Sequence, residues 1–144
     1  MERINVEGDF VLDSSVIIKW FSNEEETQIA LKLRENYVKG NLSITCPDLV
    51  IYETANALRF NKHLKENDVK NSVNSLLLMG INIIVPTKNV IECAISIAFQ
   101  YNITLYDSYF VALAQELNFK YVTADEKLYD KIKKLGFVRL LKNI

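Results

Sequence analysis

Four acidic residues stand at positions where a carboxylate needs an explanation. Asp13 directly follows a short apolar run, and Asp125 comes two residues after the apolar and β-branched segment that ends at Thr123. Glu53 and Asp107 lie inside segments whose neighbours are mostly apolar. A charge in such company requires a partner, because an unpaired buried carboxylate is costly.

Carboxylates that converge in one cleft repel one another unless a cation neutralises them. Oxygen ligands alone favour a hard divalent ion, Mg²⁺ or Mn²⁺, over the softer metals that prefer Cys and His. Such an ion orients a water molecule, lowers its pKa and neutralises charge on a reacting phosphate, so the set suits phosphodiester hydrolysis.

Each of these acids also has an ordinary structural interpretation. Asp13 and Asp125 stand where a helix N-cap would stand, and Thr104 to Asp107 resembles a capping box with Asp in place of Glu. Glu53 has no capping role, and its alternative is a buried ion pair with Arg59 or a lysine. Taken singly, these alternatives remain open; taken together, the four acids favour a metal site.

The elements that must position these acids follow from the hydrophobic pattern. Short apolar runs that end in Pro or in polar residues predict strands, and apolar residues at helical spacing predict helices. The expected strands are 10–12, 43–46, 81–85, 120–123 and 137–141, and the expected helices are 16–21, 24–38, 47–60, 66–79, 88–100, 105–117 and 125–135. This alternation predicts one α/β domain over residues 1–144, a three-layer sandwich with a mainly parallel central sheet. Ligands of such sheets bind beyond the carboxyl ends of the strands, where Asp13 and Asp125 are expected.

The composition restricts the function classes. Lys and Arg number 17 and Asp and Glu 18, a formal charge of −1, so any nucleic acid must be held locally and not by a broad basic face. Cys46 and Cys93 form no Cys-x-x-Cys pair and are interpreted as small core residues. His63, the only histidine, lies in a polar run and is interpreted as a bystander, which disfavours a Ser/His/Asp triad.

No apolar stretch approaches the roughly 20 residues that span a bilayer, and no apolar leader follows Met1. We therefore expect a cytoplasmic protein with no membrane partner.

The ordered acidic motifs resemble those of PIN domains, and of the VapC-type toxins among them. The matching segments are, in chain order, Val11-Leu12-Asp13-Ser14-Ser15-Val16 with Lys19-Trp20-Phe21, Pro47-Asp48-Leu49 with Glu53-Thr54-Ala55-Asn56-Ala57-Leu58, Leu105-Tyr106-Asp107-Ser108-Tyr109-Phe110-Val111-Ala112-Leu113-Ala114, and Val122-Thr123-Ala124-Asp125-Glu126-Lys127-Leu128. Each motif alone is weak, whereas the ordered set across nearly the whole chain is specific.

The resemblance implies a PIN fold, a homodimer and endonucleolytic cutting of RNA with a divalent metal, as the toxin of a type II pair. It also implies a small antitoxin protein that blocks the site with its C-terminal tail. Carried over by position, Asp13, Glu53 and Asp107 would be metal ligands and Asp125 a further ligand or water-positioning acid. The expected supporting residues are Ser15, Asn56 and Thr123, and the expected RNA phosphate contacts are Lys19, Arg59, Lys62 and Lys127.

Other interpretations of these residues compete with this one. Trp20 and Phe21 could stack on a base, although their apolar neighbours favour the core or a dimer interface. A receiver domain would need an acid after the third strand, and a haloacid-dehalogenase-like phosphatase would need Asp-x-Asp after the first; neither is present. Two alternatives stay open: a PIN nuclease of RNA processing outside a toxin pair, and a non-catalytic PIN scaffold that binds a partner.

Overall fold

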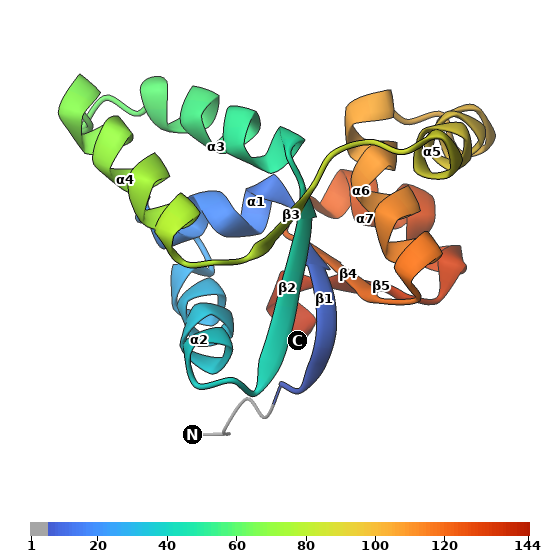
Figure 1. Ribbon diagram of the computed structural model, residues 1–144, viewed down its shortest axis with the longest axis horizontal. Helices are drawn as coiled ribbons and strands as arrows, with labels where there is room; N and C mark the ends of the chain where they lie inside the picture. The colour runs from blue at the N-terminus through green and yellow to red at the C-terminus, as the bar shows by residue number, and fades with distance from the viewer. Residues whose placement is uncertain (1–5) are drawn as a thin grey trace.

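The computed structural model describes residues 6–144, and its centre is a five-stranded sheet (Figure 1). The strands are β1 (Gly8–Leu12), β2 (Leu42–Pro47), β3 (Asn82–Ile84), β4 (Lys120–Thr123) and β5 (Val138–Leu140). Their order across the sheet is β3-β2-β1-β4-β5, and every neighbouring pair is parallel.

Helices cover both faces of this sheet, because each parallel pair requires a crossover and a helix supplies it. In Figure 1, α1 to α4 lie on one side of the sheet and α5 to α7 on the other. The α-helices are α1 (Ser14–Ile17), α2 (Thr27–Val38), α3 (Leu49–Arg59), α4 (Glu66–Leu78), α5 (Lys88–Tyr101), α6 (Leu105–Leu117) and α7 (Glu126–Ile132). The 3-10 helices are η1 (Ile18–Trp20), η2 (Lys133–Leu135) and η3 (Leu141–Asn143). The predicted three-layer α/β sandwich is confirmed.

Several predicted boundaries were wrong by a few residues. The helix expected from residue 24 begins at Thr27, because the Thr27 hydroxyl accepts a hydrogen bond from the backbone N–H of Glu24 at 2.9 Å and holds the preceding residues in a turn. The helix expected over 125–135 ends at Ile132 and continues as η2 up to Gly136. The two outermost strands, β3 and β5, are each shorter than expected, since an edge strand pairs on one side only.

The order of strands creates a switch point between β1 and β4. The chain builds β1, β2 and β3 outward in one direction and then returns to place β4 on the free side of β1. Asp13 sits directly at this point, with its backbone N–H donating to the Val122 carbonyl at 2.9 Å. Ligands of open parallel sheets bind at such a position, where the carboxyl ends of adjacent strands diverge toward opposite layers.

The core lies against both faces of the sheet, and α6 is its most buried helix. Residues Ser108–Ala114 of α6 are all buried, because this helix contacts the sheet on one side and α5 on the other. Trp20 is a core residue whose Nε1–H donates to the Ala30 carbonyl at 2.8 Å, which leaves Phe21 packed at the edge of the same core. Cys46 is buried as expected, whereas Cys93 is only half-buried, and both are free thiols. Within residues 6–144, no helix is both long and apolar enough to cross a bilayer.

Candidate active site

Three of the four predicted acids line one open cavity at the switch point. Asp13 comes from the end of β1, Glu53 from the middle of α3 and Asp107 from the first turn of α6, around a cavity of about 300 Å³. Asn56, one turn after Glu53, lines the same cavity and is exposed. Asp125, the fourth acid, lines an adjoining cavity that shares Ser15 with the first. The sequence motifs therefore converge in space.

Asp13 is the most buried of the four, with 6% of its surface exposed. Its Oδ2 accepts hydrogen bonds from the Ser15 hydroxyl at 2.5 Å and the Thr123 hydroxyl at 3.0 Å. Burial raises the pKa of Asp13, while these hydroxyl donors lower it in part. Asp13 occupies the N-cap position of α1, but its side chain makes no capping hydrogen bond there, so the capping alternative is wrong for this residue.

Ser15 and Thr123 connect Asp13 to the end of β4. The Ser15 oxygen accepts from the Ala124 backbone N–H at 3.0 Å, and the Thr123 oxygen accepts from the Asp125 N–H at 3.1 Å. Both hydroxyls are thus fixed by backbone groups that lie far from Asp13 in sequence. They orient the carboxylate between two strands and do more than a local cap would do.

Glu53 is held by a residue that the sequence did not single out. The Ser14 hydroxyl donates to Glu53 Oε1 at 2.7 Å. Within the described residues Glu53 forms no ion pair with Arg59 or any lysine, so its structural alternative is not observed. Burial raises the pKa of Glu53, the Ser14 hydroxyl lowers it in part, and the charges of Asp13 and Asp107 raise it further.

Asp107 and Asp125 differ in how far the capping alternative holds. Thr104 caps α6 by accepting from the Asp107 backbone N–H at 3.1 Å, but the reciprocal bond from the Asp107 carboxylate is not formed, so this is half a capping box. Burial, Asp13 and Asp125 raise the pKa of Asp107. Asp125 is a true N-cap, because its Oδ1 accepts from the Leu128 N–H at 3.1 Å, although its side chain is otherwise exposed beside the cavity.

Tyr121 is a second residue that sequence analysis missed. Its phenol is fully buried on β4, and in the part of the chain that the structure describes its hydroxyl has no hydrogen-bond partner of good geometry. It lies close enough to Asp13 to lower the pKa of that carboxyl, and burial together with the Asp13 charge raises the pKa of Tyr121 well above its usual range. A strand residue two positions before Thr123 faces the same way as Thr123, which is the signal that could have found it.

The electrostatics of this site fit a divalent cation. In residues 6–144, no lysine or arginine forms an ion pair with any of the four carboxylates. The donors around the cavity are carboxylate, amide and hydroxyl oxygens, which suit Mg²⁺ or Mn²⁺. Within the same residues no group of three or more His, Cys, Asp or Glu side chains stands close enough to hold an ion directly. Mg²⁺ keeps several of its waters in proteins, so a site that contacts the ion partly through water is compatible with this spacing.

The basic residues expected near RNA are placed unequally. Lys19 is buried, and its Nζ lies 3.7 Å from Glu24 Oε1. Arg59 is exposed at the end of α3, where its guanidinium lies 5.0 Å from the centre of the Phe60 ring. The two remaining residues of the set are exposed to solvent: Lys62 and Lys127.

These features define a class of protein, namely three-layer α/β domains with an acidic site at the switch point of a parallel sheet. Comparison with known proteins identifies the family. The PIN-domain model matches residues 10–135, and this chain belongs to the PIN-domain family.

Relatives agree with this assignment. Ribonuclease VapC3 of Pyrobaculum aerophilum is 30% identical over 127 residues, which cover 84% of this chain and 92% of that protein. A toxin–antitoxin complex from Klebsiella pneumoniae contains a chain with a TM-score of 0.64 at 17% identity, over 91% of this chain and 96% of the other. Mycobacterium tuberculosis VapC20, a sarcin–ricin loop cleaving toxin, gives a TM-score of 0.67 at 13% identity, over 90% and 96%.

Proposed function

We propose that this protein is a Mg²⁺- or Mn²⁺-dependent endoribonuclease of the VapC type. The observation that carries the proposal is the buried Asp13 carboxylate, which is oriented by two hydroxyls and lines one cavity with two further acids. Within residues 6–144, no cationic side chain is paired to any of the three. Carboxylates kept in this arrangement cost stability, and a divalent cation offsets that cost.

The residue roles follow from the contacts. Asp13, Glu53 and Asp107 would hold the cation, and Asp125 would be a further ligand or would position the attacking water. When bound, the cation supplies charge neutralisation at the phosphate and a water of lowered pKa. Ser15 and Thr123 fix Asp13, and Ser14 fixes Glu53, so both carboxylates keep their orientation as RNA enters. Asn56 lines the same cavity and can donate its amide to a phosphate or a cation-bound water.

RNA as the substrate, and a role as the toxin of a type II pair, are supported by the relatives. The name of the 30% identical relative is that of a ribonuclease, and related folds occur in a toxin–antitoxin complex. The proposal includes a small antitoxin protein as partner and a homodimer as the active form. The exposed Arg59, Lys62 and Lys127 would contact RNA phosphates.

The test is cleavage of a structured RNA by the purified protein with Mg²⁺, Mn²⁺ or EDTA. Asp13→Asn/Asp107→Asn is compared with Asp130→Asn, a surface variant that also removes an aspartate charge but lies outside the cavity in an ion pair with Lys133. We expect cutting only with metal, its loss in the double variant and its retention in Asp130→Asn. Equal cutting by all three proteins would overturn the assignment of the site. Metal binding by calorimetry without any cutting would favour a partner-binding scaffold.

A further inference from the structure

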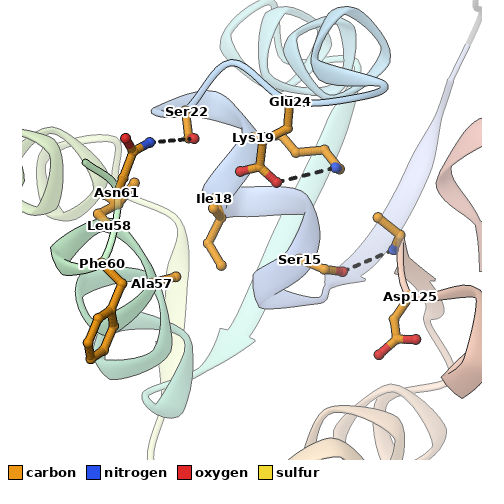
Figure 2. A pocket seen from close by; sticks show the side chains of 11 residues that line it. Ser15, Ile18, Lys19, Ser22, Glu24, Ala57, Leu58, Phe60, Asn61 and Asp125 are labelled. Carbon is orange, nitrogen blue, oxygen red and sulfur yellow. Dashed lines mark hydrogen bonds and ion pairs between the residues drawn. The ribbon is translucent and has the colours of Figure 1, made fainter. Parts of the chain in front are cut away.

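A second cavity adjoins the acidic cavity and has a different character. Its volume is about 470 Å³, within the range of roughly 300–1,000 Å³ that is usual for ligand pockets. It shares Ser15, Ile18 and Ala57 with the acidic cavity, so a strand of RNA bound at the acids would pass directly over its opening. In Figure 2 the lining residues of η1 lie in the middle, those at the end of α3 lie on the left and Asp125 lies on the right.

The lining of this second cavity combines apolar side chains with paired polar groups. Ile18 and Ala57 contribute apolar surface, and Phe60, which is 69% exposed, stands at the rim. Two polar pairs also line it, both drawn in Figure 2: Lys19 with Glu24, and Asn61 with Ser22.

The polar groups keep hydrogen-bonding capacity for a ligand. Lys19 and Glu24 are 3.7 Å apart, and within residues 6–144 the Lys19 ammonium makes no hydrogen bond. Asn61 Nδ2 donates to the Ser22 hydroxyl oxygen at 3.0 Å, which leaves the Ser22 O–H and one amide N–H of Asn61 to donate. The turn that carries Glu24 is fixed by Thr27, whose hydroxyl accepts from the Glu24 N–H and donates to the Ser22 carbonyl. The carboxylate is therefore presented by an ordered turn.

The charged groups of this lining disfavour a phosphate as the occupant. Lys19 is the only cation that lines the cavity in the described chain, and it faces Glu24 while Asp125 adds a second carboxylate. Because Lys19 is already paired with Glu24, the described lining offers a phosphate no unpaired positive charge, whereas the acidic cavity would offer its bound cation. A neutral, planar group with an apolar face and a polar edge fits this mixed lining. A nucleobase has this form, and single-stranded RNA is read by stacking and by hydrogen bonds to base edges.

We propose that this cavity binds the base of a nucleotide adjacent to the scissile phosphate, and that Glu24 and Lys19 select guanine there. The inference rests on the proposed ribonuclease function and names the substrate preference of that site. Guanine is the base whose pairing edge carries two adjacent N–H donors beside a carbonyl acceptor. The acceptor-only carboxylate of Glu24 matches the two donors, and the donor-only ammonium of Lys19 matches the carbonyl. Figure 2 shows the Phe60 ring directed away from Lys19 and Glu24, so it would stack on a neighbouring base of the same strand.

The experiment is metal-dependent cleavage of a pool of RNA strands that contain a randomised segment, with sequencing of the cut ends. Wild type is compared with Glu24→Gln, whose amide has the same shape but accepts at one atom only, and with Glu25→Gln, an exposed neighbour that does not line the cavity. We expect guanine enrichment at one position beside the cut in wild type and in Glu25→Gln. In Glu24→Gln the guanine enrichment should fall by about 10- to 100-fold, because that factor corresponds to the loss of a hydrogen bond to a charged group.

A second variant tests the apolar rim. Phe60→Leu should raise KM for a single cleavable strand by about ten-fold through lost stacking, with kcat nearly unchanged. Unchanged guanine enrichment in Glu24→Gln would overturn the proposal, and it is also the result expected if the cavity holds a side chain of a protein partner. Absence of all cutting by the wild-type protein would overturn the ribonuclease function instead, so the two failures are distinguishable.

Discussion

Glu35 on the outer face of α2 and the carboxylates of the acidic cavity have different hydrogen-bond donors and opposite pKa shifts. Glu35 on α2 is solvent-exposed and lies 3.0 Å from Lys39 Nζ and 3.2 Å from Lys32 Nζ. Hydrogen bonds from these two lysines lower the pKa of Glu35. In the cavity, Asp13 and Glu53 instead accept hydrogen bonds from hydroxyl groups, and burial raises the pKa of each.

This difference places the unbalanced negative charge in the acidic cavity and not on the outer face of α2. Lysines are placed one helical turn from an exposed glutamate, where an ion pair adds little to stability. Among the residues that the structure describes, none of them is paired with the buried carboxylates, where a partner would matter most. Under the proposed function, this cavity would take a cation from solution, and the bound cation would balance the charge of its carboxylates.

The largest expected effect comes from removing one buried charge. Asp13→Asn should lower the single-turnover rate of RNA cutting by about 1,000-fold or more, because several kcal/mol of metal-dependent stabilisation are lost. The metal-free fold should melt at or above the wild-type temperature, since a desolvated charge and its repulsion of Glu53 are removed. Wild-type activity in this variant would contradict the role of Asp13.

The cation itself should stabilise the folded protein, and more so as pH rises. The raised pKa values of Asp13, Glu53 and Asp107 mean that the folded state binds more protons than the unfolded state above the ordinary values of 3.8 for Asp and 4.5 for Glu. Stability of the metal-free protein therefore falls as pH rises from those values through the raised ones. At a concentration 100 times its dissociation constant, Mg²⁺ or Mn²⁺ should restore about 2.7 kcal/mol at neutral pH. Melting curves with and without metal at pH 4 to 8 test this, and a metal effect that does not change with pH would contradict it.

A smaller effect is expected from loosening a carboxylate without removing its charge. Ser15→Ala removes the hydroxyl that donates to Asp13 and accepts from the Ala124 N–H, and it should weaken Mn²⁺ binding by about ten-fold in calorimetry. Ser43→Ala is the matched control, because Ser43 donates to Asp9 near the opposite end of the same sheet. Equal metal affinity in the two variants would assign Ser15 a structural role alone.

The smallest effect is expected on the other side of the comparison. Glu35→Gln breaks two exposed ion pairs on α2 and should change the melting temperature by less than about 2 °C, with RNA cutting and metal binding unchanged. A shift of the metal affinity in this variant would show that the outer charges and the acidic cavity are coupled. Glu35→Gln therefore serves as the surface control for the variants of the acidic cavity.

Much of the fold and part of the site were predictable from local pattern. The helix stop at Gly40 and the helix over Leu105–Leu117 depend on turn chemistry and apolar spacing within a few residues. The start of α2 was predicted too early, because Thr27 contacts Ser22 and Glu24 in a turn that apolar spacing does not reveal.

The alternation of strands and helices was predictable from the sequence alone, as were an acid directly after β1 and another two residues after β4. The sequence could not determine that β4 lies beside β1, that Ser14 holds Glu53 or that Tyr121 is buried against Asp13. It also left undecided whether Lys19 would meet a phosphate, whereas the fold pairs it with Glu24 at the wall of a second cavity. Secondary structure follows from interactions within a few residues, but the strand order and the direction of each side chain depend on packing between segments that meet only in the folded state.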